Sequence, residues 1–332
     1  MTILITGGAG FIGSHMAGFL LEKHIDFIVL DNFSNSNLTN IKILEREYNR
    51  KINIIEADLR IKKDIEKVFI NNHIDSVIHF AALKSVEESE LNKNLYYSNN
   101  VVGSINLLDC IKLNNIKTFI FSSSACVYGE PAYLPMDENH PIKPLSQYGK
   151  NKVDIENFLK QDNYFLQNCK TIILRYFNPI GSFTNGLIGE NLIDIPNNLM
   201  PYIMGVATKK FPFLKIYGDD FDTEDGTAIR DYIHIMDLVE AHFFALETKL
   251  TGLEIFNVGT GNGYSVKQIV KTFEQVNTIK IPFEVHQRRP GDVVECYSNS
   301  NKINSILGWK AKRDLKQMCE DSYKFAIQFV NN

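Results

Sequence analysis

The stretch MTILITGGAGFIG (residues 1–13) decides the fold, because a short apolar run leads directly into Gly7, Gly10 and Gly13. The apolar run predicts a strand, and a helix is expected to begin near Phe11. Between a strand and a helix, glycines at this spacing allow a tight turn, close approach of the backbone to a pyrophosphate and close helix-on-strand packing. The stretch predicts a dinucleotide-binding turn, with a glycine-rich structural turn as the alternative.

Further short apolar runs follow along the first half of the chain: Phe27 to Leu30, Ile52 to Ile55, Val77 with Ile78, Phe119 to Phe121, and Ile172 to Leu174. Strands that helices cover on both faces have this pattern. Helical spacing of apolar residues predicts crossover helices over Asn94 to Leu113 and Gln147 to Leu166. The expected fold class is therefore α/β, with a Rossmann-type doubly wound parallel sheet.

Turn-rich stretches interrupt shorter elements after about residue 178, for example at Pro179 to Gly189 and Gly218 to Gly226. We expect a dinucleotide-binding domain over residues 1–177 and a smaller C-terminal α/β lobe over residues 178–332. The lobe is expected to bind mainly substrate, with the alternative that some of its segments return to the first domain.

The composition is that of a soluble globular protein, with 332 residues, 44% apolar and 22% charged. The net charge of −4 gives no basic field for nucleic acid. The cysteines are dispersed without metal-ligand spacing, so we expect no metal site and a reducing compartment. Without a basic leader or an apolar stretch of roughly 20 residues, we expect a cytoplasmic protein that does not associate with membranes.

Asp31 follows Gly13 by 18 residues, at the end of the second apolar run. A carboxylate in this place can accept hydrogen bonds from the ribose hydroxyls of a dinucleotide. It also repels a 2′-phosphate, so the predicted cofactor is NAD.

The reactive residues are predicted at Ser122 to Ser124, which end the fifth run, and at Tyr148 and Lys152. Tyr148 and Lys152 are four residues apart and share one face of a helix. A free tyrosine has a pKa of about 10, and a neighbouring ammonium favours its phenolate form as a base. Ser124 lies where open α/β sheets bind ligands and could pass a substrate proton to Tyr148. An ordinary exposed Tyr–Lys pair is the alternative.

The glycine turn, Ser124 and the Tyr148–Lys152 pair together resemble the extended short-chain dehydrogenase/reductase family. Longer stretches resemble its UDP-glucose 4-epimerases, from the first strand to RRPGDV near residue 293. These stretches are HFAALKSVEES (79–89), SSSACVYG (122–129), LRYFNPIG (174–181), IPNNLMPYI (195–203) and TEDGTAIRDYIHIMDL (223–238).

The resemblance implies an NAD-dependent isomerase that interconverts UDP-glucose and UDP-galactose through a transient 4-keto sugar. Tyr148 would take the proton of the sugar 4-hydroxyl while hydride passes from C4 to NAD⁺, and Lys152 and Ser124 would assist. Relatives commonly form homodimers through two helices per subunit, which here match Asn94 to Leu113 and Gln147 to Leu166.

The resemblance also implies two sets of binding residues. The cofactor would contact Gly7, Gly10, Phe11, Ile12, Gly13, Asp31, Asn32, Ser36, Asp58, Leu59, Phe80, Ala81, Lys84, Asn99, Ser122, Tyr148, Lys152 and Phe177. The UDP-sugar would contact Lys84, Ser124, Cys126, Tyr148, Asn178, Asn198, Leu199, Lys215, Tyr217, Arg230, Tyr232, Arg289, Asp292 and Cys296. Forked, permanently charged arginines suit a pyrophosphate, although either arginine alone could be a surface charge.

Two cysteines depart from the pattern of many relatives. Cys126 replaces a hydroxyl beside the sugar with a weaker hydrogen-bond donor. Cys296 matches a position where relatives restricted to non-acetylated sugars carry a bulky tyrosine. A smaller residue there predicts additional use of UDP-N-acetylglucosamine and UDP-N-acetylgalactosamine.

The same residues bear on other activities of related enzymes. A 4,6-dehydratase is expected to have an Asp-Glu pair after the strand-end serine, where this chain has Ala125 and Cys126. A uronate 4-epimerase or decarboxylase stays open, without a clear recognition site for a C6 carboxylate. A non-catalytic NAD-binding regulator is disfavoured because Tyr148 and Lys152 are both present.

Overall fold

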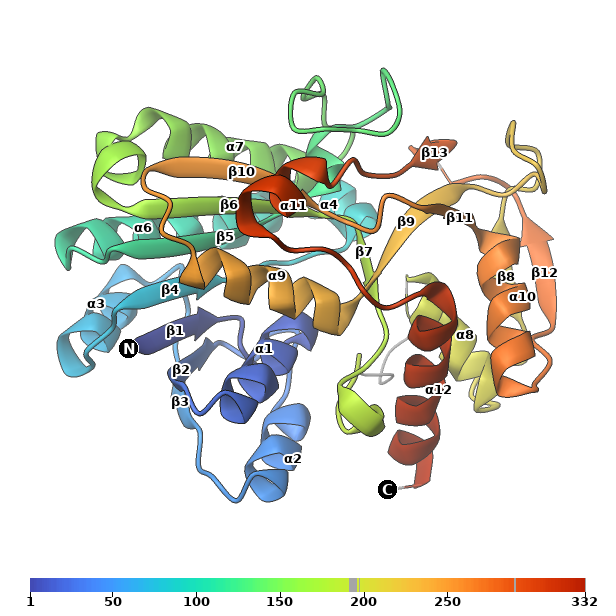
Figure 1. Ribbon diagram of the computed structural model, residues 1–332, viewed down its shortest axis with the longest axis horizontal. Coiled ribbons are helices and arrows are strands. Elements are labelled where there is room, and N and C mark those ends of the chain that lie inside the picture. The colour runs from blue at the N-terminus through green and yellow to red at the C-terminus, as the bar shows by residue number, and fades with distance from the viewer. Residues whose placement is uncertain (191–195, 197, 290, 332) are drawn as a thin grey trace. The chain divides into compact units, whose positions relative to one another are not determined.

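The structure is a computed structural model that describes residues 1–190, 196, 198–289 and 291–331 (Figure 1). The chain folds into two compact units. The first unit comprises Met1–Gly129, Pro141–Arg175 and His242–Phe256, and the second comprises Glu130–His140, Tyr176–Ala241 and Asn257–Asn332. Ile195, Asn197 and Pro290, which belong to the stretches quoted above, lie outside the described residues.

The first unit is built on a seven-stranded sheet with the order β10-β6-β5-β4-β1-β2-β3. Its strands are β1 (Thr2–Thr6), β2 (Asp26–Asp31), β3 (Asn53–Glu56), β4 (Ser76–His79), β5 (Thr118–Ser124), β6 (Lys170–Tyr176) and β10 (Leu253–Val258). β1 pairs in parallel with β2 and β4, which pair in parallel with β3 and β5. The strand order therefore reverses next to β1, which is where doubly wound sheets bind dinucleotides.

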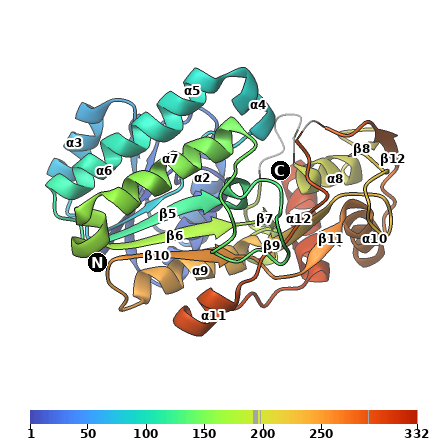
Figure 2. The same cartoon turned by 90° about the horizontal axis from the view of Figure 1, so that it is seen from above.

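Helices cover the sheet of the first unit on both faces, as its buried strands require. They are α1 (Phe11–Glu22), α2 (Thr39–Glu47), α3 (Lys62–Asn71), α4 (Val86–Leu91), α5 (Lys93–Tyr97), the π-helix η1 (Ser98–Val102), α6 (Gly103–Leu113), the 3₁₀ turn η2 (Ala125–Val127), α7 (Gln147–Gln161) and the π-helix η3 (Tyr164–Asn168). Figure 2 shows α3, α6 and α7 on one side of the sheet, and on the other the end of α9 (Ile235–Glu247), of which His242–Glu247 belong to this unit. This arrangement confirms the Rossmann-type α/β fold.

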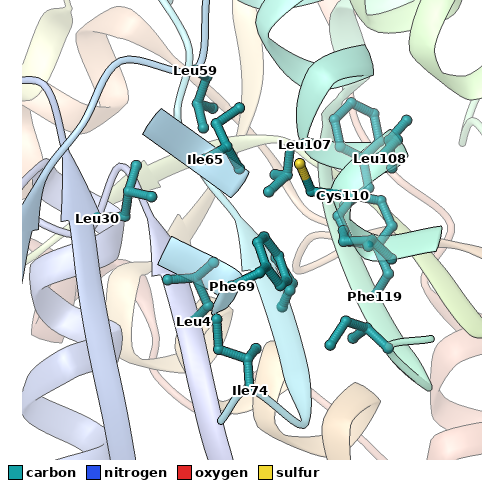
Figure 3. Close-up of a cluster of buried hydrophobic side chains, with 14 of the residues drawn as sticks. Leu4, Leu30, Leu59, Ile65, Phe69, Ile74, Leu107, Leu108, Cys110 and Phe119 are labelled. Atoms are coloured by element: carbon teal, nitrogen blue, oxygen red, sulfur yellow. The ribbon is translucent and has the colours of Figure 1, made fainter. Parts of the chain in front are cut away.

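One core of the first unit fills the space between the sheet and the α3, α6 and α7 layer (Figure 3). Alternate strand residues point into it, because successive side chains of a strand face opposite sides. Its members include Leu4, Leu30, Phe69, Leu107 and Phe119. These apolar contacts hold α7, and the reactive residues on it, against the sheet.

The two predicted crossover helices differ in detail from the structure. The segment 94–113 is helical throughout, but a π-turn, η1, separates α5 from α6. The helix expected over Gln147 to Leu166 ends at Gln161, so its predicted end was wrong. Asp162 has extended backbone angles and its carboxylate accepts a hydrogen bond from the Tyr164 amide at 2.8 Å, which starts a separate turn.

The second unit contains two small sheets and its own helices. β9 (Ile229–His234) pairs with β7 (Asn178–Ile180), β11 (Gly263–Ser265) and β13 (Glu295–Cys296), and β8 (Leu214–Tyr217) pairs with β12 (Phe283–His286). The helices are η4 (Thr184–Gly186), α8 (Leu199–Ala207), α10 (Val266–Asn277), α11 (Asn301–Leu307) and α12 (Leu315–Asn331). Their core includes Ile203, Ile216, Tyr232, Phe273 and Met318.

Within the described residues, no helix combines the length and apolar character needed to cross a bilayer. None of the five cysteines, all of which the structure describes, is in a disulfide.

Candidate active site

The glycine turn has the geometry that its sequence predicts. Gly7 has φ +67°, and a Cβ there would lie 2.6 Å from the amide nitrogen of Ala81. A Cβ on Gly13 would lie 2.3 Å from the carbonyl oxygen of Gly7. These glycines therefore allow the backbone to pass close to β4 and to α1.

Gly10 differs, because a Cβ there would have a single close neighbour within the protein. It has extended backbone angles, and its Cβ would meet only the Gly7 carbonyl oxygen, at 3.3 Å. As the N-cap of α1 it has no side chain with which to cap the first turn. The first-turn amides of a helix, including those of Phe11, Ile12 and Gly13, are then available to an anion.

Asp31 ends β2 and is 5% exposed. Its carboxylate accepts hydrogen bonds from the amides of Ala9 and Phe33, both at 3.0 Å, and from the Ser36 hydroxyl at 2.8 Å. Asp31 thus fixes the glycine turn and the loop after β2. A carboxylate has about four lone-pair sites, so it retains capacity for a ribose hydroxyl.

Asn32 and Asp58 meet at the ends of neighbouring strands, where the Asn32 amide donates to the Asp58 carboxylate at 3.3 Å. Arg60 pairs with the same carboxylate, with its Nη2 2.6 Å from Oδ2. These donors lower the pKa of Asp58 to about 2, the Arg60 hydrogen bond being the largest cause. Leu59 is buried beside them and packs against Gly103.

The loop after β4 brings several predicted cofactor residues together. Ala81 lies against Gly7, and the Lys84 ammonium lies 6.0 Å from the ring centre of Phe11. The Phe80 ring packs on the His242 ring, with ring centres 4.8 Å apart. In η1, Asn99 donates to the side chain of Asn100, which in turn binds both backbone groups of Leu83. Asn100 was missed by the sequence analysis, although π-turns are frequent at functional sites.

The Lys152 ammonium is fixed at the end of β5, where its Nζ donates to the carbonyl oxygen of Ser122 at 2.7 Å. It lies 5.7 Å from the centre of the Tyr148 ring and is 6% exposed. Ser124 is also buried, and its hydroxyl accepts from the Cys126 amide at 3.2 Å. The structure therefore brings Tyr148 and Lys152 together beside the serine run.

Burial controls the charge of Lys152. Desolvation lowers its pKa to about 8, against an opposing effect of the Cys126 and Glu156 side chains. His79, buried in β4, contacts Thr6 at 2.6 Å and Ser104 at 2.7 Å. Desolvation, followed by repulsion from Lys152, lowers the pKa of His79 to about 3, so this histidine stays neutral.

Helix α4 holds the N-terminus of α7, on which Tyr148 lies. The Ser89 hydroxyl accepts from the Tyr148 amide at 3.2 Å, and the Glu90 carboxylate accepts from the Gln147 amide at 2.6 Å. Ser146 caps the same turn by accepting from the Gly149 amide. The motif SVEES contains Ser89, but the role of Ser89 and of the adjacent Glu90 depends on a tertiary contact that spacing does not reveal.

In the second unit, two arginines surround one carboxylate. Arg289 donates to both oxygens of Asp292, at 2.9 and 3.2 Å, and Nη2 of Arg230 lies 3.6 Å from Asp292. The Arg289 guanidinium lies 5.1 Å from the centre of the Tyr217 ring. Arg230 is anchored by donating to the Ile229 carbonyl at 2.8 Å. This arginine cluster (Tyr217, Arg230, Arg289, Asp292) presents forked cations, as a diphosphate requires.

The remaining predicted substrate residues lie on other elements of the second unit, with the exception of Cys126 in η2. Cys296 pairs with Arg230 in register, and Asn178 pairs with Tyr232. Tyr232 is buried, which raises its pKa to about 12. Asn198 is the N-cap of α8, ahead of Leu199, and Lys215 lies in β8 beside Glu284. Phe177, predicted to bind cofactor, is buried and its amide donates to Val258. Among the described residues, no group of acidic, histidine and cysteine side chains could hold a metal ion.

Comparison with known proteins gives consistent matches over the whole chain. A family model described as GDP-mannose 4,6 dehydratase matches residues 4–322. The UDP-glucose 4-epimerase of Yersinia enterocolitica is 46% identical over 98% of this chain and 97% of its own length.

Two solved structures have the same fold. The epimerase from Stenotrophomonas maltophila, with bound NAD and formylated UDP-arabinopyranose, has a TM-score of 0.96 and 36% identity, covering 100% of this chain and 99% of its own. The epimerase from Bifidobacterium longum, in complex with NAD⁺ and UDP, has a TM-score of 0.95 and 39% identity, with the same coverage. Given these matches, the chain belongs to the extended short-chain dehydrogenase/reductase family and, within it, to the UDP-glucose 4-epimerases.

Proposed function

We propose that this protein interconverts UDP-glucose and UDP-galactose with NAD as cofactor, and that Tyr148 is the catalytic base. The observation that carries the assignment of the base is the buried Lys152 ammonium, fixed to the Ser122 carbonyl and 5.7 Å from the Tyr148 ring centre. Family membership supports the reaction and the cofactor.

The residues of the first unit fit NAD. A Cβ on Gly10 would have one close protein neighbour, the Gly7 carbonyl oxygen, and the first turn of α1 offers amides to a pyrophosphate. Asp31, Asn32 and Asp58 present polar groups at the ends of β2 and β3, suited to the adenosine portion. When bound, NAD supplies a reversible acceptor for the hydride of the sugar C4.

The chain's own residues handle the proton of the sugar 4-hydroxyl. Tyr148 accepts this proton at its phenol oxygen, and Ser124 orients the hydroxyl by a hydrogen bond. The Lys152 ammonium favours the charged phenolate, and its own position is fixed by the Ser122 carbonyl. When the other 4-epimer forms, Tyr148 returns the proton to the sugar O4, so these residues end the reaction unchanged.

The arginine cluster of the second unit serves the UDP portion in this proposal. Arg230 and Arg289 would bind the diphosphate. Asp292 would give up part of its pairing with these arginines and bind the uridine ribose. Asn178, Asn198, Leu199, Lys215, Tyr217 and Tyr232 are proposed to complete the contacts. Strong contacts to UDP and few to the sugar suit a reaction in which the 4-keto sugar must rotate in the pocket to present its other face.

The proposed sugar range includes N-acetylated substrates, because Cys296 is small. Cys296 lies in β13 and is half-buried. A tyrosine side chain is larger by a whole ring, so the cysteine leaves room for a 2-acetamido group.

Proton NMR of the purified protein, without added NAD, tests both levels of the proposal. UDP-galactose and UDP-N-acetylgalactosamine are followed in parallel tubes, and conversion of both is expected. Conversion of UDP-galactose alone would refute the broad sugar range. No conversion of either, even after NAD is added, would refute the epimerase assignment.

We also propose a homodimer in the cytoplasm. Leu95 and Val102, in the segment matched to the dimer helices, are 42% and 40% exposed, which supports a partner on this segment. The absence of disulfides among the five cysteines supports a reducing compartment. Light scattering of the wild type and of Leu95→Lys tests the dimer, since a charge on a contact face would give monomers.

A further inference from the structure

Glu156 is a buried carboxylate of α7 that the proposed mechanism does not use. It is 1% exposed, and its main partner, Arg175 of β6, is 1% exposed as well. Burying two charges is unfavourable unless each is fully paired, so such a pair is weak evidence for stability alone.

The contacts of Glu156 link three elements of the first unit. Its Oε1 accepts from the Ser123 hydroxyl at 2.7 Å and from Nε of Arg175 at 2.9 Å. Its Oε2 accepts from Nη2 of Arg175 at 2.5 Å and from Nζ of Lys160 at 3.1 Å. Arg175 also donates to the Tyr128 hydroxyl at 3.1 Å.

These contacts fall beside the proposed catalytic residues. Tyr148, Lys152 and Glu156 follow one another at intervals of four on α7, so they lie along one face. Lys152 donates to Ser122 and Glu156 accepts from Ser123, so two successive residues of β5 bind two successive turns of α7. Ser124, proposed to bind the substrate hydroxyl, is the next residue of the strand.

We propose that Glu156 is a positioning residue for epimerisation, which holds α7 in register with β5 and keeps the Lys152 side chain in its ammonium form. The inference rests on the proposed roles of Tyr148 and Lys152. Glu156 acts through these residues and through Ser123, and it needs no contact with substrate or cofactor.

The charges around Lys152 support the second part of this role. The titratable groups that face it are Tyr148 and Glu156 of α7, Cys126 of η2 and His79 of β4. His79 is neutral, so it adds no positive charge. Burial lowers the pKa of Lys152 to about 8, while the Cys126 and Glu156 side chains oppose this effect. Glu156 is the carboxylate in this set, and losing its charge would favour the neutral amine.

The test is the pH dependence of kcat for UDP-galactose in Glu156→Gln, which removes the charge and keeps one of the two acceptor oxygens, the other being replaced by an amide NH₂ group. We expect kcat to fall about tenfold with KM changed less than about twofold. The alkaline limb of the profile should move to lower pH, because Lys152 would lose its proton earlier. A loss of stability alone would scale kcat at every pH without moving the limb.

Three further variants separate geometry from charge. Glu156→Asp keeps the charge on a shorter arm, so kcat should fall while the alkaline limb stays at the wild-type pH. Ser123→Ala keeps the buried ion pair and should lower kcat a few-fold, which keeps the idea testable if Glu156→Gln does not fold. Lys160→Met removes only the 35% exposed partner and should leave both kcat and the profile unchanged.

A folded Glu156→Gln protein with wild-type kcat would overturn the inference, as would a lower kcat with an unmoved alkaline limb. If Glu156→Gln is unfolded, wild-type kcat in Ser123→Ala and Glu156→Asp would overturn it. In all these cases the wild type converts UDP-galactose. A wild type that converts no UDP-galactose would refute the proposed function instead.

Discussion

The two charged regions of this protein differ in how firmly their cations are held. In the first unit, Lys152 is 6% exposed, and burial lowers its pKa to about 8. In the second, the side chains of Arg230 and Arg289 are 17% and 45% exposed and share the carboxylate of Asp292. The buried cation is matched to one backbone carbonyl, whereas the exposed cations have a partner that a ligand can replace.

This difference separates chemistry from binding. A buried ammonium acts strongly on its neighbours because water does not screen it, but it can lose its proton near neutral pH. A guanidinium keeps its charge in any surroundings and forms forked hydrogen bonds with anions. Changes in the first region should therefore alter kcat and its pH profile, and changes in the second should alter affinity for UDP.

The largest effect is expected for Tyr148→Phe, which removes the phenol oxygen and keeps the ring. We expect kcat to fall about a thousandfold or more, measured by NMR with UDP-galactose. NAD content and inhibition by UDP should stay at wild-type values, because the ring still packs in place. A kcat within about tenfold of wild type would show that another group is the base.

Lys152→Met should lower kcat about a hundredfold and change the pH dependence of stability. The folded state binds the Lys152 proton less tightly than the unfolded chain, so this residue's contribution to stability is fully present above pH 10.5 and is lost as pH falls through about 8. The drop in pKa from 10.5 to about 8 corresponds to about 3 kcal/mol. In urea unfolding at several pH values, the free energy of unfolding of the wild type should rise relative to that of Lys152→Met as pH rises. Wild-type activity should decline over the same range. If the unfolding free energies of the two proteins changed with pH in parallel, the result would contradict a buried Lys152 ammonium.

Arg230→Met should weaken competitive inhibition by UDP about a hundredfold, and Arg289→Met about tenfold. Arg230 is the less exposed of the two and is oriented by a backbone carbonyl, so less ordering is needed on binding. The matched control is Arg288→Met, because Arg288 pairs with Asp220 and stacks on Phe221. Equal effects of all three variants would mean that only net charge matters.

The smallest effect is expected for Asp58→Asn. The paired Asp58 carboxylate has its pKa lowered to about 2, so its stabilisation is present above about 3.8 and is lost as pH falls toward 2. Because Arg60 is partly exposed, the loss should be below about 1 kcal/mol. The affinity for NAD should fall a few-fold, measured by dialysis and rebinding. Asp64→Asn, which breaks an exposed pair with Lys67, should leave NAD affinity unchanged.

The sequence predicts the fold well where the signal is local. Each predicted apolar run lies in a strand, except that Ile52 precedes β3, because strands buried on both faces are continuously apolar. The end of α7 was missed because the competing hydrogen bond of Asp162 leaves no mark on apolar periodicity. The π-turn at Ser98–Val102 was missed because it lies inside a continuous helical segment.

The sequence likewise predicts the parts of the site that depend on local motifs. Motif spacing places Tyr148 beside Lys152, and the glycines at the first turn. Motif spacing does not show that Ser89 and Glu90 hold the start of α7. It also does not show that Glu156 of α7 pairs with Arg175 of β6. These contacts join residues that are 19 to 59 positions apart in the sequence. The roles of the binding residues stay predictions until the variants above are measured.

The cysteines have a practical consequence for spectroscopy. Cys110, Cys169 and Cys319 are buried, and burial raises their pKa to about 11, 11 and 12, so their thiols should react slowly with alkylating reagents. The half-buried Cys126 and Cys296 lie in different units. An absorbance assay with a thiol reagent should therefore show two faster-reacting cysteines, and bound UDP-sugar should slow both, because both are proposed to contact the sugar.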